Sequence, residues 1–136
     1  MNKTIFHAEE WLKPKRKTKG SAAYDFIAPH DVTVLADGQT DFDTQVSVEV
    51  EEGYVLLLVP RSSLGIFAGI TLSNDVGVID SDYRQNIRAS LVNRRKEPYV
   101  IHKGERYMQG FIIPYFTTAD DDATEERTGG LGSTGR

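Results

Sequence analysis

Cysteine is absent from this chain of 136 residues. Its absence excludes disulfide bonds, thiol catalysis and metal sites built on thiolates, and it is consistent with a reducing compartment. Long apolar runs are absent as well. None approaches the roughly 20 residues of a membrane-spanning helix, and the first residues lack the apolar centre of a secretory signal. The sequence therefore predicts a cytoplasmic protein that does not bind membranes.

Positive charge is in short supply, because 16 Lys and Arg stand against 20 Asp and Glu and leave a net charge of −4. This balance argues against stable binding of nucleic acid. The densest basic run, residues 13–19, contains a proline and no aromatic residue, so we interpret it as a solvated loop. The histidines His7, His30 and His102 are too far apart in sequence for metal-ligand spacing, and no Ser-His-Asp arrangement is legible.

Long helical segments are the third absence, since no stretch carries the signature of a helix of ordinary length. Short apolar runs separated by turn-forming residues instead predict one all-β domain, built as a sandwich or a barrel. The expected strands are residues 21–28, 32–35, 45–50, 54–59, 99–101 and 106–114. The run at 54–59 is continuously apolar, which favours a strand buried on both faces.

The composition changes after residue 117, where the predicted β-rich core ends and a flexible tail of residues 118–136 begins. The tail has too little apolar content to fold alone. If extended, it could reach about 66 Å and cross to another subunit, and the alternative is a frayed terminus. Its G-x-G-x-x-G match lacks the strand and the helix of a dinucleotide site. Its glycine N–H groups and hydroxyls could nevertheless wrap a polyphosphate.

Residues 77–84 form the segment around which the chain is organised. A glycine and two β-branched residues favour a strand, and a Ser-Asp pair then favours a turn. We interpret residues 87–92 as the second arm of a hairpin. A hairpin tip holds backbone donors and acceptors in fixed positions that could bind a flat ligand, and Asp80 could hold a water there. The alternative is a surface turn with solvated acids.

Residues 60–65 follow the apolar run directly. Pro60 ends the strand, and Ser62 or Ser63 could cap a short helix. Unpaired N–H groups at a helix start, with Arg61 beside them, favour an anion site, and a plain helix cap is the alternative. Gln109 is a polar residue within the last predicted strand, where it is either a structural hydrogen-bond partner or a ligand contact.

Five segments, taken in order, resemble the five motifs of the trimeric dUTPase (dUTP diphosphatase) family: residues 22–26, 60–65, 77–84, 106–109 and 129–135. The resemblance covers nearly the whole chain. It implies a distorted β jelly roll, or β-clip, that forms a homotrimer with the tail exchanged onto a neighbouring active site. It also implies hydrolysis of dUTP to dUMP and pyrophosphate, which limits uracil in DNA and supplies dUMP for thymidylate synthesis.

The resemblance further implies a role for each matching residue. Asp80 would activate the attacking water, Tyr83 would pack on the deoxyribose and exclude a 2′-hydroxyl, and Asp25 would hold Mg²⁺ through water. The other residues implied for the nucleobase and the sugar are Asn74, Gly77, Val78 and Ile79. The residues implied for the phosphates are Arg61, Ser62, Ser63, Gln109, Arg127, Gly130, Gly132, Ser133 and Thr134.

Two departures from the family's pattern lie in the tail. Leu131 occupies the place of a Phe that usually covers the uracil, so the lid should be weaker or completed by an aromatic from elsewhere. Glu126 stands where an arginine is usual, and Arg127 follows one place later.

Two alternatives use the same fold. One is a nucleotide-responsive regulatory module that binds an unknown protein partner, a role that viral and prophage members of the family can have. If this protein is viral, it would act in the host cytoplasm. The other, ranked lower, is a dCTP deaminase, which needs a catalytic Glu that residues 77–84 lack.

Overall fold

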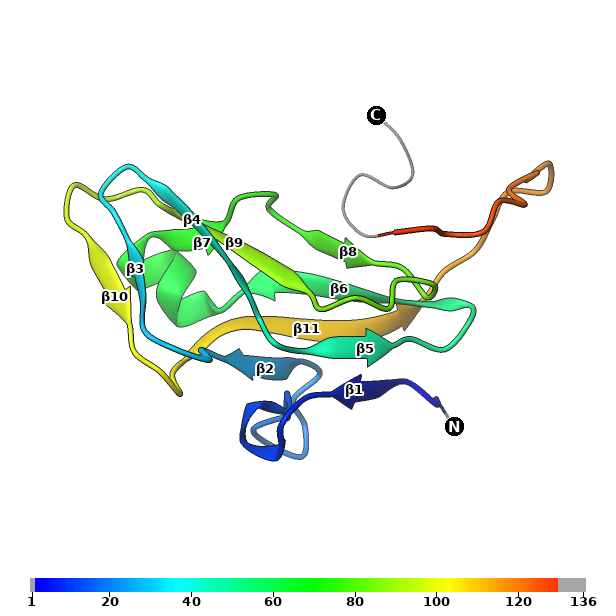
Figure 1. Cartoon of the computed structure of the whole chain (residues 1–136), viewed down its shortest axis with the longest axis horizontal. Coiled ribbons are helices and arrows are strands. Elements are labelled where there is room, and N and C mark those ends of the chain that lie inside the picture. The colour runs from blue at the N-terminus through cyan, green and yellow to red at the C-terminus, as the bar shows by residue number, and fades with distance from the viewer. Residues whose placement is uncertain (1, 130–136) are drawn as a thin grey trace.

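The computed structural model describes residues 2–129 and confirms the predicted all-β class (Figure 1). Its strands are β1 (Ile5–His7), β2 (Tyr24–Ile27), β3 (Val32–Val34), β4 (Gln39–Asp43), β5 (Ser47–Glu49), β6 (Tyr54–Pro60), β7 (Ile70–Leu72), β8 (Gly77–Ile79), β9 (Arg88–Asn93), β10 (Tyr99–Ile101) and β11 (Arg106–Pro114). Two short helical segments are η1 (Glu10–Leu12) and η2 (Ser63–Ala68). No helix in the described part of the chain is long and apolar enough to cross a membrane.

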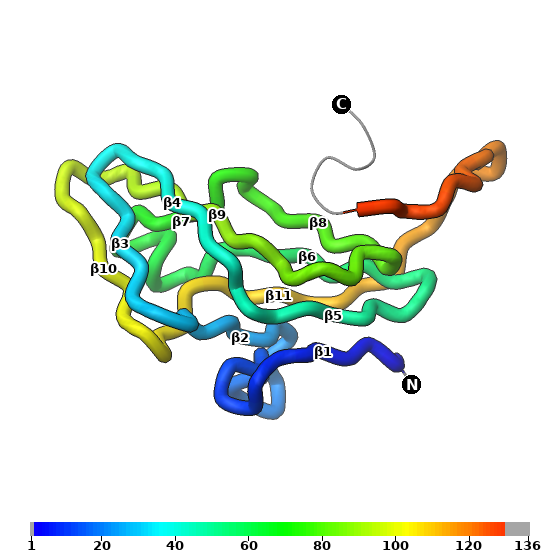
Figure 2. The backbone as a smooth tube through the Cα atoms, in the orientation of Figure 1, coloured from blue at the N-terminus to red at the C-terminus, as the bar shows by residue number. Residues whose placement is uncertain are grey.

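All strand pairs are antiparallel. The largest sheet has the order β2-β11-β6-β8, and a second sheet has the order β4-β9-β7. The pairs β1-β5 and β3-β10 complete the arrangement. The backbone tube shows β10 and the β3–β4 turn at one end of an elongated body, and the start of β1 and residues 118–129 near the other (Figure 2).

The core lies between the sheets and is built mainly from alternate strand residues, with an exception on β11, where the register shifts between Arg106 and Met108. On β6, Leu56 and Leu58 are buried, and on β11 Tyr107 and Met108 are almost fully buried. A Cβ at Gly110 of β11 would lie 2.9 Å from Leu58 Cδ2 and 3.0 Å from Leu56 Cδ1. A methyl group would fit there only if these two buried side chains shifted.

The opposite face of the large sheet is only half covered. Val55 and Leu57 are half-buried, and Val78 and Ile113 are exposed. The interpretation of residues 54–59 as a strand buried on both faces is therefore wrong for the single chain. The continuous apolar run reflects a second apolar face that the chain itself leaves partly open.

The predicted hairpin is also wrong. β8 pairs with β6, whereas β9 pairs with β4 and β7 in the other sheet. The intervening residues 80–87 carry the chain from one sheet to the other, where the Ile87 N–H donates to the Val46 carbonyl at 2.8 Å. β8 and β9 therefore belong to different sheets.

β4 and η2 also differ from what the sequence predicts. β4, which runs Gln-Thr-Asp-Phe-Asp, is too polar to be recognised as a strand from its own residues. The short helix predicted after Pro60 is present as η2, but no serine side chain caps its start. η2 ends at Gly69, whose φ of 68° lies in the left-handed region that suits glycine.

Gly110→Ala should lower the free energy of unfolding by about 1–3 kcal/mol, since the added methyl group overpacks the β6–β11 core. Chemical denaturation measures the change. Gly20→Ala is the matched control, because nothing lies within 4 Å of a Cβ at Gly20, and it should stay within about 0.5 kcal/mol of the parent. Equal stability of the two variants would contradict the packing account.

Candidate active site

Asp80 lies directly after β8 on a turn whose shape is held by its neighbours. The Tyr83 N–H donates to the Asp80 carbonyl at 3.1 Å, and the buried Tyr83 donates its hydroxyl to the Asn86 carbonyl at 3.0 Å. Behind the turn, Gly77 packs so closely on Leu58 that a Cβ would lie 3.0 Å from it. A half-exposed carboxylate is thus presented on a firmly packed support.

β8 is the last strand of its sheet within the described residues, so only one of its edges is paired. The register pairs Gly77 with Leu58, Val78 with Leu57 and Ile79 with Leu56. The other edge offers unpaired backbone donors and acceptors, which are templates for binding a second chain or a ligand. This arrangement suits the predicted recognition of a flat base by the backbone of Gly77, Val78 and Ile79.

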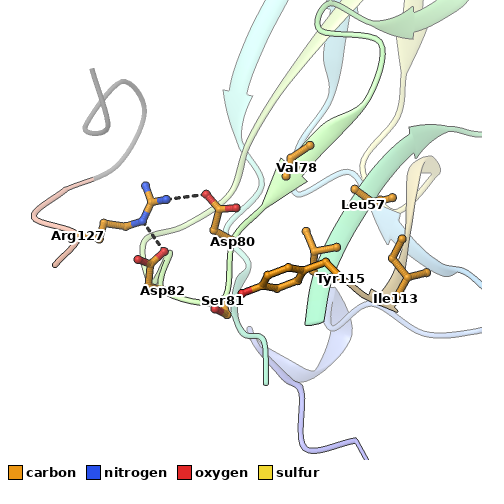
Figure 3. A pocket seen from close by; sticks show the side chains of 9 residues that line it. Leu57, Val78, Asp80, Ser81, Asp82, Ile113, Tyr115 and Arg127 are labelled. Atoms are coloured by element: carbon orange, nitrogen blue, oxygen red, sulfur yellow. Dashed lines mark hydrogen bonds and ion pairs between the residues drawn. The ribbon is translucent and has the colours of Figure 1, made fainter. Parts of the chain in front are cut away.

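Arg127 bridges the two carboxylates of this turn (Figure 3). Its Nη2 lies 2.6 Å from Asp80 Oδ2, its Nε lies 2.7 Å from Asp82 Oδ1, and its guanidinium carbon lies 5.8 Å from the centre of the Tyr83 ring. Hydrogen bonding to Asp82, together with the charge of both carboxylates, raises the pKa of Arg127. The predicted phosphate ligand therefore lies against Asp80 in the free chain.

A pocket of about 480 Å³ lies beside this turn. Its lining combines an apolar floor with charged groups and consists of Val55, Leu57, Val78, Asp80, Ser81, Asp82, Ile113, Tyr115 and Arg127. The sequence does not predict Tyr115 as a lining residue. The only indication in the sequence is that Tyr115 lies two residues after Ile113, at the end of the last strand. Asn74 lines a different pocket, between β4, β7 and β9, together with Asp41 and Arg88.

A second group of predicted residues gathers at the far end of the same sheet. Asp25 on β2 is paired with Gln109 on β11, so their side chains share one face. Asp25 Oδ1 lies 3.8 Å from Arg61 Nε, and its Oδ2 lies 3.5 Å from Arg106 Nη1. The Gln109 amide donates to the Pro60 carbonyl at 3.1 Å. Arg106 belongs to the motif-like segment 106–109, but the resemblance implies no role for it, and its contact with Asp25 depends on the β2–β11 register.

Arg61, Arg106 and Gln109, together with the serines at the start of η2, offer cationic, amide and hydroxyl donors to an anion. Ser62 and Ser63 are exposed and make no capping bond, so their hydroxyls face solvent. Asp25 is the one carboxylate of the group, and its side chain is 15% exposed. No cluster of three His, Cys, Asp or Glu that could hold a metal ion occurs in residues 2–129.

The two groups share one face of the sheet but lie far apart. The register places Asp80 beside Val55 and Gln109 opposite Val59, four positions along β6. Four residues span about 13 Å along the strand, and the three strand spacings from β8 to β2 span about 14 Å across the sheet. Because these two directions are perpendicular, Asp80 and Asp25 lie roughly 20 Å apart. Groups that act on one phosphate must lie within hydrogen-bonding reach of it. Asp80 and Asp25 of one chain are therefore too far apart to contact the same phosphate.

The predicted tail ligands Gly130, Gly132, Ser133 and Thr134, and the predicted lid Leu131, fall outside the described residues.

The chain matches the family model described as dUTPase over residues 9–135. It is 41% identical over 133 residues to the deoxyuridine 5′-triphosphate nucleotidohydrolase of Methylobacillus flagellatus, covering 92% of this chain and 89% of that relative. The crystal structure of dUTPase from Streptococcus mutans is similar at 32% identity and a TM-score of 0.78, covering 84% of this chain and 98% of that one.

A dUTPase mutant from phage phi11 of S. aureus, described with a structural Mg(II) ion, is similar in fold at 23% identity and a TM-score of 0.77. The match covers 91% of this chain and 98% of that one. Together these likenesses confirm the expected jelly-roll class.

Arg127→Gln should release the tail from the turn, since the charged contacts to Asp80 and Asp82 are lost. Backbone ¹⁵N relaxation is expected to give order parameters below about 0.6 for residues 120–128 in the variant, and higher values in the parent. Glu126→Gln, one residue earlier, is the control and should leave the tail as ordered as in the parent. Equal order in Arg127→Gln and the parent would show that this contact does not hold the tail.

Proposed function

The chain belongs to the dUTPase family and is a dUTP diphosphatase that hydrolyses dUTP to dUMP, and from this premise we propose that Asp80 orients the attacking water. The observation that carries the proposal is the half-exposed Asp80 carboxylate on a packed turn, next to the unpaired edge of β8. A carboxylate in this position can accept a proton from water without moving. General-base placement of this kind is typically worth about 10²–10⁴-fold in rate.

The proposed reaction is attack of water on the α-phosphorus, with the proton passing to Asp80 and pyrophosphate leaving. Arg127 occupies Asp80 Oδ2 in the free chain, and its release would leave both carboxylate oxygens open to the water. We infer that the triphosphate draws Arg127 away, which would restore its predicted role as a phosphate ligand. Charge neutralisation by Arg127 and Arg61 would then stabilise the leaving group.

Base and sugar recognition follows from the same turn. The unpaired edge of β8 supports hydrogen bonding of uracil by the backbone of Gly77, Val78 and Ile79. A close-fitting edge would exclude the 5-methyl group of thymine, and its donor pattern would mismatch cytosine. The Tyr83 ring is held by its hydroxyl bond to Asn86, which supports its proposed packing on the deoxyribose with no space for a 2′-hydroxyl.

Members of the family use a divalent metal ion, and we propose Mg²⁺ for this chain with Asp25 as its water-mediated ligand. When bound, Mg²⁺ would neutralise charge on the phosphate oxygens. A single carboxylate fits an ion that keeps most of its waters and takes its remaining ligands from the substrate. Asp25 also sits between Arg61 and Arg106, so its own charge is already balanced in the free chain.

A homotrimer with tails exchanged between subunits is the proposed assembly. The separation of roughly 20 Å between Asp80 and Asp25 supports it, because a second chain is needed to bring both groups to one nucleotide. The half-covered apolar face of the large sheet supports it too, since Val78 and Ile113 are exposed in the single chain. Closure by residues 118–136 over a neighbour, and a cytoplasmic location, stay predictions.

The two alternatives are not favoured. A dCTP deaminase would need a catalytic Glu, and none lines the pocket beside Asp80. A regulatory module needs a protein partner, and none of the described features identifies one.

Asp80→Asn should fold and bind dUTP, but its turnover should fall by about 10²–10⁴-fold, since an amide cannot accept the proton from water. Pyrophosphate release and equilibrium nucleotide binding measure the two effects separately. Asp82→Asn is the matched control, because it loses the same kind of contact to Arg127 and should keep most of its activity. Turnover in Asp80→Asn close to that of the control would rule out Asp80 as the base.

A further inference from the structure

The basic loop of residues 13–19 lies against the proposed phosphate end of the site. It holds Lys13, Lys15, Arg16, Lys17 and Lys19 in a chain with a net charge of −4. The sequence predicts a solvated loop for this run. Figure 1 shows it curled beneath β2, which is the strand that carries Asp25. Five of the 16 Lys and Arg residues of the chain therefore lie together beside Asp25.

The loop is fastened to the backbone of Asp25 itself. The Asp25 N–H donates to the Lys15 carbonyl at 2.8 Å, and the Lys15 N–H donates to the Asp25 carbonyl at 3.4 Å. Residues that exchange both bonds in an antiparallel pair have side chains on the same face. The Lys15 side chain therefore shares a face with the Asp25 carboxylate.

The shape of the loop is held by its own hydrogen bonds. Arg16 Nη1 donates to the Lys19 carbonyl at 3.0 Å and to the Ser21 carbonyl at 2.9 Å. The hydroxyls of Thr18 and Ser21 lie 2.7 Å apart. The cations are consequently presented on a closed loop with a defined shape, which reduces the entropy that binding must overcome.

A pocket of about 270 Å³ opens between the loop and the sheet. Its lining consists of Trp11, Lys13, Lys15, Arg16, Lys17, Asp25, Ile27 and Arg106. Lys103 extends the basic rim, with its Nζ 5.0 Å from the centre of the Trp11 ring. Asp25 is the one acid of this lining, and two arginines already face it. The pocket is therefore strongly electropositive.

Two of the three lysines that line this pocket have no counter-charge. Lys15 Nζ lies 3.4 Å from Glu10 Oε1, but the side chains of Lys13 and Lys17 make no hydrogen bond or ion pair with any residue in the described part of the chain. Unpaired cations gathered in a concave site raise the local concentration of anions and speed their arrival. The cluster around Asp25, Arg61 and Arg106 is the neighbouring proposed site for phosphate.

We propose that Lys13 and Lys17 form a polyphosphate subsite that holds the terminal phosphates of the substrate and the pyrophosphate product. The proposal rests on the dUTP diphosphatase function and extends its phosphate end beyond Arg61 and Gln109. A ligand that keeps these phosphates, such as dUTP or pyrophosphate, gains the contacts. A ligand without them, such as dUMP, gains nothing.

The test compares Lys13→Gln/Lys17→Gln with Arg94→Gln/Lys96→Gln, a control with the same change in net charge. Arg94 and Lys96 are exposed between β9 and β10, and Lys96 loses only a surface ion pair with Asp37. The parent and both variants are assayed as full-length chains for dUTP hydrolysis and for inhibition by pyrophosphate and dUMP. Direct calorimetric binding of pyrophosphate provides a readout that does not depend on turnover.

The loop variant should raise KM for dUTP and weaken pyrophosphate binding by about three- to tenfold, with kcat and dUMP inhibition unchanged. The effect should shrink as ionic strength rises. Identical pyrophosphate affinity in the two variants would overturn the subsite. An equal loss of affinity for dUMP, or a loss of affinity confined to duplex DNA, would also overturn the subsite. A parent chain that binds pyrophosphate but does not hydrolyse dUTP would instead overturn the proposed function alone.

Discussion

The pairing of β6 with β11 on one side and β8 on the other is the constraint on which the rest of the structure depends. The antiparallel β6–β8 register places Asp80 near the start of β6, and the chain leaves the end of β6 at Arg61. β11 then brings Gln109 opposite Asp25 on β2. Close packing around Gly110 holds these strands together, so two groups of polar residues stand at fixed places on one sheet face.

This geometry explains why a small enzyme should need more than one chain. The group that would activate water and the groups that would hold phosphate lie roughly 20 Å apart on the same strand framework. Between them lies an apolar surface that the chain leaves partly exposed. Packing that surface against another subunit would bury it and bring complementary halves of two sites together. Stability and catalysis would then depend on the same contact.

The sequence was enough to predict the strands with alternating or apolar residues, the turn at Asp80 and the place of η2. It could not predict which strands pair, because register depends on packing between distant residues. For this reason the sequence predicts a hairpin of β8 and β9, which lie in different sheets, and it contains no pattern that indicates the polar β4. The contact of Arg127 with Asp80 and the gathering of the basic loop at Asp25 depend on tertiary folding as well.

The most direct test of the central claim is pyrophosphate release from dUTP, measured with and without Mg²⁺ beside dTTP, dCTP and UTP. The account predicts fast, Mg²⁺-dependent release from dUTP alone. The edge of β8 would exclude thymine and cytosine, and Tyr83 would exclude the ribose of UTP. Comparable release from UTP would contradict the role of Tyr83, and comparable release from dTTP or dCTP would contradict base recognition by β8. Binding of dUTP without any release would contradict the dUTP diphosphatase activity itself.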